Sequence, residues 1–355
     1  RGIDQVEVEY EPLPTVFDPV EALKPDAPII HEKMKEYRVS PAFKPIPGTN
    51  IANQFKLVRG DVEQGLNESD VIVEGEFGIP HVSHGFMELQ SMVAHYKKDG
   101  NIEIWTSTQS PFSTRYLMAL SLGIPIDKIV IKAPLCGGGF GGKVGIGWEP
   151  LVALLSKRAG YRPVKLVLSR KEQFSSAPVR EGFHASVKAG FKKDGKMLAY
   201  KARFVMDAGG YADYTVNVCR AAGYSSEGCY EVPNIFCESL AVYTNKGATS
   251  AMRGFGYPES HWALERTMDM AAEKLKMDPV ELRLRNLLKP GVSETGTGEK
   301  LRQDTGDPVA VTKSVAQSIS WGQPSEKPTK LGRYRGKGIA LCIKGPAQPP
   351  NAAAS

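Results

Sequence analysis

The stretch Gly137-Gly-Gly-Phe-Gly-Gly-Lys143 decides how this chain of 355 residues is interpreted. It follows the apolar run 129–131, which has the composition of a buried strand, and it comes shortly before a helix expected from Glu149. Glycines let the backbone take positive φ angles and approach a ligand closely, so amide groups can line an anion. The stretch therefore predicts an anion-binding loop between a strand and a helix, and a tight turn without a ligand is the alternative.

Two nucleotide-binding motifs match this loop only in part. Gly137, Gly142 and Lys143 fit most of a Walker A motif, but Val144 stands where a serine or threonine would bind magnesium. The G-x-G-x-x-G spacing of a Rossmann fold is also present, but residues 144–147 separate the glycines from the helix that would hold a pyrophosphate. A nucleotide-binding protein is therefore the competing interpretation, and both departures disfavour it.

Two further loops lead into expected helices. The loop Ala251-Met-Arg-Gly-Phe-Gly256 carries Arg253, a permanent cation that could donate to an oxo or phosphate oxygen. The loop Thr106-Ser-Thr-Gln-Ser110 carries Gln109, whose side-chain amide could donate to a ligand just before a serine–proline helix start. Helix N-termini favour anions, so one anionic, phosphate-bearing cofactor would explain all three loops together.

The remaining sequence predicts an α+β (mixed α/β) fold. Asp-Gly pairs at 99–100 and 194–195 each lie between two alternating apolar runs, which is a strong hairpin signal. The proline-rich residues 11–50 predict an extended connector, and the alternation in residues 5–10 predicts a strand. Helices bounded by proline, aspartate or glycine are expected over residues 111–122, 149–158, 258–275 and 278–288.

Composition excludes several classes of protein. The net charge of +6 comes from 45 basic and 39 acidic residues that are scattered along the chain, so no polybasic run predicts nucleic-acid binding. No apolar stretch approaches the roughly 20 residues of a membrane span. The five cysteines show no C-x-x-C spacing, which is typical of reduced thiols in a cytoplasmic protein.

The chain resembles the large, molybdopterin-binding subunits of the molybdenum hydroxylases, the family of xanthine dehydrogenase and aldehyde oxidoreductase. The similarity covers essentially the whole chain, and its combination of motifs is far more specific than any single one. The matching segments, in the family's order and approximate spacing, are residues 8–14, 107–109, 137–143, 252–256 and 277–286.

The resemblance implies how the chain is divided. Residues 1–14 would be the C-terminal strand of a hammerhead domain, and residues 15–54 would be an extended connector. Residues 55–332 would form the first molybdenum-cofactor-binding domain, and residues 333–355 would begin the second. The chain would then be a fragment or a split subunit, and we expect it to be inactive by itself.

The resemblance also implies the chemistry. The cofactor would be molybdopterin, and the reaction would hydroxylate an electron-poor carbon of an N-heterocycle or an aldehyde with oxygen from water. The family's base is a glutamate in a late Gly-Glu-Pro-Pro-like segment, which we expect on the remaining molybdenum-domain segment. Iron–sulfur and FAD subunits or domains would be the other partners, with 2Fe-2S clusters and FAD as their cofactors. A structural module that has lost the cofactor is a further alternative.

Residue roles follow by matching position in the family's motifs. Gln109 would hydrogen-bond the oxo ligand, Phe140 would present its backbone beside the metal, and Arg253 would lie near the same pole. Gln109 and Arg253 are thus the expected catalytic residues, and with Phe140 they would surround the molybdenum without ligating it. The other expected cofactor-binding residues are Gly138, Gly139 and Gly141.

Three residues are expected to contact the substrate. Phe255 would form one face of the substrate slot, and Arg180 would reach the substrate or the developing charge. Val144 stands where purine-oxidising members carry a glutamate, which weakens an assignment to xanthine and leaves aldehydes or other heterocycles open. Gly254 stands where carbon monoxide dehydrogenases carry a cysteine, which disfavours copper–molybdenum chemistry.

Overall fold

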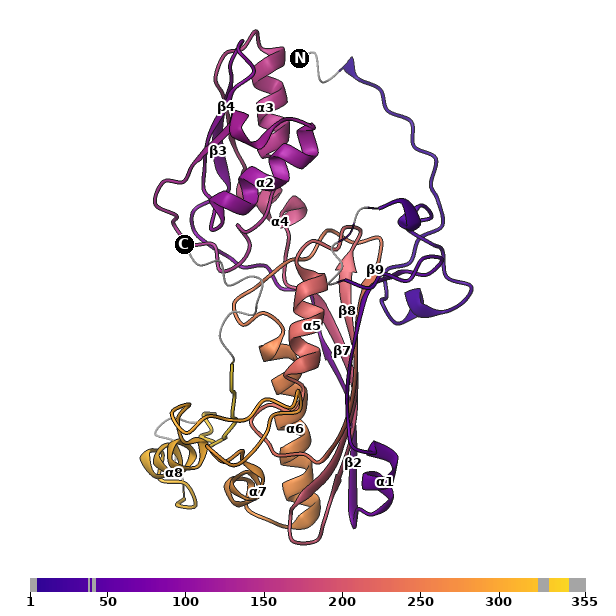
Figure 1. Ribbon diagram of the computed structural model, residues 1–355, viewed down its shortest axis with the longest axis vertical. Coiled ribbons are helices and arrows are strands. Elements are labelled where there is room, and N and C mark those ends of the chain that lie inside the picture. The colour runs from indigo at the N-terminus through magenta and orange to yellow at the C-terminus, as the bar shows by residue number, and fades with distance from the viewer. Residues whose placement is uncertain (1–4, 38, 40–42, 325–331, 345–355) are drawn as a thin grey trace.

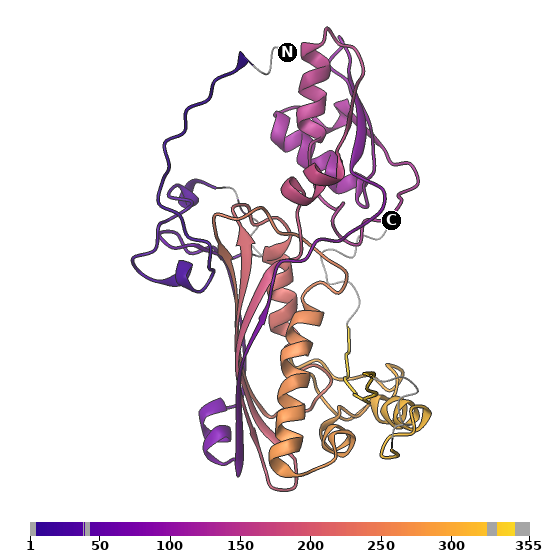
Figure 2. The ribbon, with the colours of Figure 1, turned by 180° about the vertical axis from the view of Figure 1, so that it is seen from behind.

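Residues 5–37, 39, 43–324 and 332–344 are described by a computed structural model. Two lobes lie one above the other, each with its own sheet, and Figures 1 and 2 show them from opposite sides. This α+β arrangement is the one predicted from the sequence. In the described part of the chain, no helix is both long enough and apolar enough to cross a membrane.

The lower lobe is built on a five-stranded mixed sheet with the order β1-β9-β8-β7-β2. Parallel pairing joins β8 and β9, and the other neighbours are antiparallel. Helices α5 and α6 cover one face, while α1 lies on the other (Figure 1). The strands are β1 Ile51–Arg59, β2 Val71–Ile79, β7 Gly182–Phe191, β8 Met197–Gly209 and β9 Asn234–Tyr243. The helices are α1 Val62–Asn67, α5 Thr215–Tyr224, α6 Tyr257–Leu275, α7 Pro279–Asn286 and α8 Pro308–Ser318.

The upper lobe is built on a four-stranded sheet with the order β5-β4-β3-β6, in which only β4 and β5 are parallel. Its core joins Ile102 and Ile104 of the sheet to Met118 and Val152 of two helices, all fully buried. The elements are β3 Ser91–Tyr96, β4 Ile102–Thr106, α2 Pro111–Leu122, β5 Ile129–Lys132, α3 Glu149–Arg158, β6 Val164–Val167 and α4 Arg170–Ser176. Short 3-10 helices span Glu21–Leu23, Met34–Glu36 and Ile126–Lys128.

Both hairpins predicted from Asp-Gly turns are present, as β3–β4 and β7–β8. The four expected helices also form, and Gly123 ends α2 in the left-handed conformation. Ser110 does occupy the N-cap position of α2, but its hydroxyl accepts from the backbone of Gly145 instead of capping the helix. That contact links the start of α2 to the residues that follow the glycine-rich stretch 137–143.

The two chain ends differ from the sequence expectations. The described residues 6–14 form no strand and run extended, away from both sheets (Figure 1). A strand needs a neighbour to take its backbone hydrogen bonds, and alternation alone does not supply one. The expected connector 15–54 also contains two 3-10 helices and the first residues of β1. Residues 1–4 and 345–355 of the expected terminal domains lie outside the described residues.

The chain crosses between the lobes twice, through residues 80–90 and residues 168–181. The two crossings pair with each other, because Arg180 donates its backbone N–H to the carbonyl of Val82 at 2.9 Å. The segment that leads into the loop of residues 251–256 lies beside them, because Val179 forms a β-bridge with Thr249. The three loops singled out in the sequence therefore meet at this junction.

Candidate functional site

The glycine loop, residues 137–143, contacts both of the other loops. Gly141 donates its backbone N–H to Oε1 of Gln109 at 2.8 Å, and Gln109 donates its own backbone N–H to the carbonyl of Lys143 at 2.8 Å. On the other side, Arg253 donates its backbone N–H to the carbonyl of Phe140 at 2.9 Å. The structure thus brings Gln109, Phe140 and Arg253 together at one site, which the sequence could not show.

The orientation of the Gln109 side chain is set by the glycine loop. Its Oε1 accepts from the backbone N–H groups of Gly141 at 2.8 Å and Lys143 at 3.4 Å. The oxygen therefore faces the loop and the Nε2 group faces away from it. Gln109 is exposed, and Nε2 has no acceptor among the described residues. The side chain consequently presents two free N–H donors to a ligand.

The backbone of the glycine loop offers further donors. The backbone N–H groups of Gly138, Gly139 and Phe140 have no hydrogen-bond acceptor in the described part of the chain. Phe140 has a φ angle of 51° between glycines at 98° (Gly138) and 101° (Gly141), a conformation that is costly for a phenylalanine. Successive free N–H groups in such a turn form a concave site for an anion.

Two glycines of this loop are needed because atoms of the other two loops lie very close to them. A Cβ on Gly139 would lie 2.3 Å from Oε1 of Gln109, and a Cβ on Gly141 would lie 2.4 Å from the carbonyl oxygen of Ala251. Both distances are far below van der Waals contact, so a side chain on Gly141 would push the backbone of the arginine loop away, and one on Gly139 would displace the side chain of Gln109. The glycines therefore allow the three loops to pack against each other.

The arginine loop, residues 251–256, ends at the N-terminus of α6. Phe255 has a φ angle of 57°, so both Gly-Phe-Gly motifs hold their phenylalanine in the left-handed conformation. Gly256 packs against α5, because a Cβ there would lie 2.6 Å from the carbonyl oxygen of Val218. The Arg253 side chain is exposed, and its guanidinium has no partner among the described residues. A free cation therefore stands beside the free donors of the glycine loop.

Arg180, in contrast, is already paired. Its guanidinium forms an ion pair with Glu259 at 2.7 Å and donates to the carbonyl of Arg253 at 2.7 Å. The Glu259 side chain is 1% exposed, and burial raises its pKa while Arg180 opposes that rise. Glu181 lies fully buried beside the pair, where desolvation and the charge of Glu259 raise its pKa to about 8. Arg180 thus fastens the arginine loop to α6, and its contact with substrate stays a prediction.

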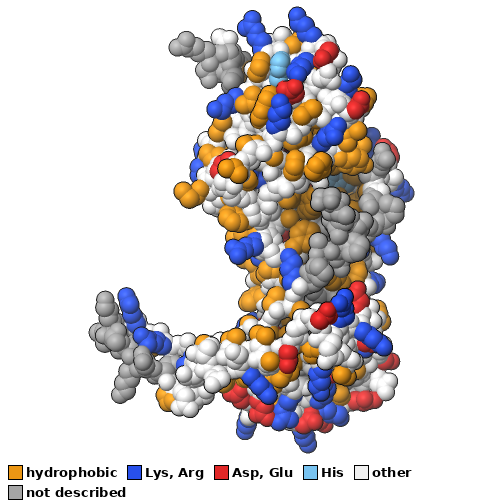
Figure 3. Space-filling model, turned by 60° about the vertical axis from the view of Figure 1, so that its left-hand side comes forward, with side chains coloured by type: hydrophobic (Ala, Val, Ile, Leu, Met, Phe, Trp, Pro, Cys, Tyr) orange, Lys and Arg blue, Asp and Glu red, His pale blue; other side chains and the backbone are white. Residues whose placement is uncertain are grey.

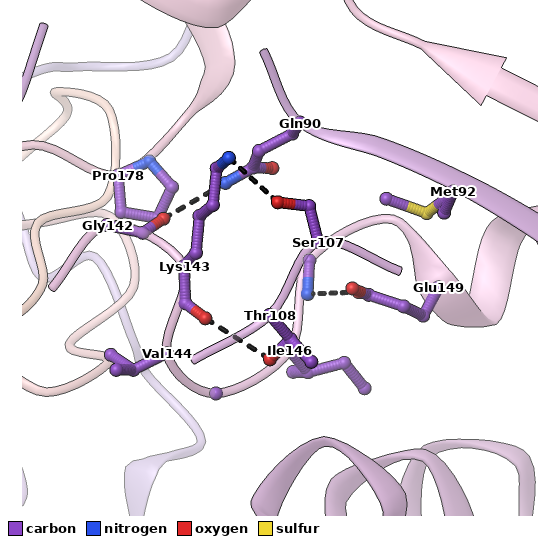
Figure 4. A pocket seen from close by; sticks show the side chains of 12 residues that line it. Gln90, Met92, Ser107, Thr108, Gly142, Lys143, Val144, Ile146, Glu149 and Pro178 are labelled. Atoms are coloured by element: carbon purple, nitrogen blue, oxygen red, sulfur yellow. Dashed lines mark hydrogen bonds between the residues drawn. The ribbon is translucent and has the colours of Figure 1, made fainter. Parts of the chain in front are cut away.

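Lys143, which could have served as a phosphate ligand, is fully buried. Its ammonium donates to the carboxylate of Glu88 at 2.6 Å and to the backbone carbonyl of Glu88 at 2.9 Å. It also donates to the hydroxyl of Ser107 at 2.8 Å (Figure 4). It also lies 4.7 Å from the ring centroid of Phe86. All three N–H donors are used, so none is available to a nucleotide.

Val144 lines a small cavity of about 20 Å³ behind the loop, which has room for about one water molecule (Figure 4). Gln90 and Thr108 also line it. Nε2 of Gln90 donates to the carbonyl of Gly142 at 3.0 Å, and the hydroxyl of Thr108 donates to the carbonyl of Lys143 at 3.2 Å. This cavity is too small for a cofactor, so it belongs to the support of the loop.

Two histidines near the site have separate partners. Nε2 of His84 lies 2.8 Å from the carbonyl oxygen of Ala251, and burial lowers the pKa of His84. His81 faces Asp207 instead, at 3.1 Å. The described residues contain no group of three or more histidine, cysteine, aspartate or glutamate side chains that could hold a metal ion.

The sequence indicates Glu88 only as a structural hydrogen-bond acceptor before a strand, and it gives no sign that Glu259 belongs to the site. Glu88 follows a glycine-containing turn with no motif of its own, and Glu259 occupies the first turn of α6, where an acidic residue is ordinary. The signal that could have found them is the buried cation that each one pairs with. Lys143 and Arg180 both need a nearby carboxylate once they are inside the fold.

Known proteins resemble the chain over most of its length. The profile described as "Molybdopterin cofactor-binding domain" matches residues 43–287. A probable xanthine dehydrogenase subunit from Bacillus subtilis is 32% identical over 344 residues, which are 97% of this chain and 44% of that protein. The nicotinate dehydrogenase large molybdopterin subunit of Eubacterium barkeri is 32% identical, over 86% of this chain and 68% of that protein.

A solved structure shares the fold. The aldehyde oxidoreductase of Desulfovibrio gigas matches with a TM-score of 0.80 and 30% identity, over 89% of this chain and 33% of that chain. The chain thus spans less than half the length of both that enzyme and the Bacillus relative. All the expected cofactor-binding residues, 109, 138–141 and 253, fall within the matched profile.

Proposed function

The chain belongs to the family of molybdopterin cofactor-binding domains, and from that premise we propose that its three converging loops bind one pole of the cofactor in a molybdenum hydroxylase. The observation that carries the proposal is the fixed side chain of Gln109. Its oxygen is held by the glycine loop, so its N–H donors stay free, and the backbone N–H groups of residues 138–140 in the adjoining loop are free as well. An electron-rich, anionic ligand fits this set of donors.

The residues present fit the cofactor. Gln109 and the free backbone donors of Gly138, Gly139 and Phe140 would hold its anionic oxygen atoms, and Arg253 would neutralise charge beside them. Gly141 contributes by letting the arginine loop approach. When bound, the cofactor would supply the two-electron oxidation of the substrate with oxygen derived from water.

The substrate proposed is an electron-poor carbon of an N-heterocycle, purine-like or nicotinate-like, or of an aldehyde. Phe255 would form one wall of the substrate slot, with a half-buried ring that also packs against the core of the lower lobe at the start of α6. Val144 would leave that slot without the carboxylate that we expect in purine oxidisers. Arg180 would influence substrate binding through the arginine loop that it holds in place. Direct contact with the substrate would require a substrate anion to displace Glu259 from the ion pair.

The rest of the enzyme is proposed to lie on other segments or subunits. We infer that a remaining molybdenum-domain segment supplies the base glutamate, and that iron–sulfur and FAD subunits carry the electrons away. Exposed apolar side chains support a covering partner: Leu135 is 98% exposed and Met87 is 90% exposed, and both lie beside the glycine loop. Figure 3 shows apolar side chains gathered on the upper lobe and near the junction of the lobes.

The test is metal and pterin analysis of the chain purified together with its partners. We expect molybdenum and pterin in equal amounts, about one per chain, and oxidation of nicotinate, hypoxanthine or benzaldehyde with an artificial electron acceptor. Gln109→Ala should lower activity strongly, whereas Gln64→Ala on α1, which also removes an exposed glutamine, should not. Absence of molybdenum and pterin from the intact complex would refute the proposal and favour a cofactor-free module.

A further inference from the structure

Glu88 connects both ends of the glycine loop. Its carboxylate Oε2 accepts from the backbone N–H of Gly137 at 2.7 Å, where the loop begins, and from the ammonium of Lys143 at 2.6 Å, where it ends. The same atom accepts from the hydroxyl of Ser107 at 2.6 Å. One carboxylate oxygen therefore closes the glycine loop into a ring and ties that ring to the loop of Gln109.

Lys143 passes this restraint to Gln109. Its carbonyl accepts from the backbone N–H of Gln109 at 2.8 Å, and its own N–H donates to Oε1 of Gln109 at 3.4 Å. The ammonium of Lys143 has no freedom to move, because it is fully buried and uses all its donors on Glu88 and Ser107. The backbone that holds the Gln109 side chain is thus fixed by the Glu88–Lys143 pair.

The packing around the pair is equally tight. A Cβ on Gly137 would lie 2.7 Å from Cβ of Glu88, so a glycine is needed for the carboxylate to reach the loop. Burial opposes ionisation of Glu88, but the hydrogen bonds from Lys143, Ser107 and Gly137 outweigh it and lower its pKa to about 2. The Glu88 carboxylate therefore stays charged at any pH near neutrality.

We propose that the Glu88–Lys143 ion pair is a positioning element that sets the direction of the Gln109 amide donors toward the cofactor. This inference rests on the proposed function, because it assigns the pair a role at the same site. Neither Glu88 nor Lys143 would touch the cofactor itself. Their effect would pass through the orientation of Gln109, so removing the pair should resemble removing Gln109.

The experiment compares variants of the whole complex. Lys143→Met keeps the length of the side chain and removes the charge, and it leaves Glu88 partly accessible to water, with 31% of its side chain exposed. Lys157→Met is the matched control, since Lys157 belongs to the same lobe and also lies over an aromatic ring, 5.2 Å from the centroid of Tyr96. Gln109→Ala and the double variant Lys143→Met/Gln109→Ala complete a double-mutant cycle.

Three quantities are measured: molybdenum per chain, the Mo(V) electron paramagnetic resonance spectrum after reduction with dithionite, and kcat and KM. Lys143→Met should keep its molybdenum, shift the Mo(V) spectrum as Gln109→Ala does, and lower kcat by roughly 10- to 100-fold with little change in KM. The double variant should be no worse than Gln109→Ala alone, because Lys143 acts through Gln109. If Lys143→Met does not fold, Glu88→Gln/Lys143→Met removes both charges together and carries the same expectations.

Two results would overturn the inference while the proposed function stands. In the first, Lys143→Met has the spectrum and kcat of Lys157→Met although Gln109→Ala changes both. In the second, the effects of Lys143→Met and Gln109→Ala multiply in the double variant, which would mean that the two residues act independently. A wild-type complex without molybdenum or pterin is a different result, because it would refute the proposed function itself.

Discussion

Replacing Arg180 with methionine removes the cation that pairs with Glu259 at the junction of the two lobes. The pair is largely out of water, since the Arg180 and Glu259 side chains are 14% and 1% exposed. Methionine is similar in length and apolar, so the change removes charge and hydrogen bonds with little loss of volume. It also removes the donor to the carbonyl of Arg253, so the arginine loop loses its attachment to this side chain.

The magnitude follows from the buried carboxylate that stays behind. Removing one partner of a buried ion pair costs about 3–5 kcal/mol, because the other charge is left without compensation. The cost should depend on pH. Burial already raises the pKa of Glu259, and loss of Arg180 raises it further, so the folded variant binds a proton that the unfolded chain releases. The destabilisation should therefore be larger at pH 8 than at pH 5.

The assay is urea unfolding followed by circular dichroism at both pH values, with steady-state kinetics on the same preparations. Arg203→Met is the control, because its partner Glu238 lies on the surface of the sheet and such pairs contribute at most about 1 kcal/mol. Arg180→Met/Glu259→Met should recover most of the lost stability by removing both charges. If Arg180→Met is as stable as Arg203→Met and only raises KM, Arg180 binds substrate and the assignment to loop support is wrong.

Three further outcomes are expected. Gly141→Ala should lower the cofactor content, and it should lower the free energy of unfolding by more than Gly123→Ala, which should cost roughly 1 kcal/mol. Both glycines have a positive φ angle, but only a Cβ at Gly141 would meet the carbonyl of Ala251. Equal melting temperatures of the two variants would contradict this. Burial raises the pKa of Glu181 to about 8, so the folded state keeps a proton that the unfolded state loses. The free energy of unfolding should therefore fall as the pH rises from about 4.5 to about 8. Urea titrations at several pH values should show a smaller decline for Glu181→Gln. Asp278→Ala should lower the free energy of unfolding by about 1 kcal/mol, because the Asp278 carboxylate caps α7 by accepting from two backbone N–H groups. Equal melting temperatures of the variant and the wild type would show that the cap contributes nothing.

Local signals in the sequence predicted the local structure well. The hairpins formed where Asp-Gly supplies the positive φ angle of the turn, as at Gly100 and Gly195. Helices α3, α6 and α7 each carry a proline in their first turn, as expected for a residue that lacks an N–H. Such signals depend only on neighbours along the chain.

The assembly of the site depends on contacts that no local signal encodes. Gln109 and Gly141 are 32 residues apart, and Arg180 and Arg253 are 73 apart. Residues 6–10, where the alternation predicts a strand, form none in the described chain for the same reason, since pairing requires a partner from elsewhere. The family resemblance pointed to loops that meet in the structure, because it carries information about long-range contacts that a single pattern lacks.

The two crossings between the lobes give the architecture a modular character. Strands β2 and β7 are antiparallel neighbours, with Ile79 opposite Phe183, so a short turn could close them as an ordinary hairpin. The whole upper lobe is thus an insertion at the tip of a hairpin of the lower sheet. Val82 and Arg180 already pair, so a lower lobe with residues 83–179 replaced by a two-residue turn would keep Arg180 and should be able to fold alone. It would keep the loop of Arg253 and lose Gln109 and the glycine loop, which is half of a composite site that exists only where the inserted lobe meets its host.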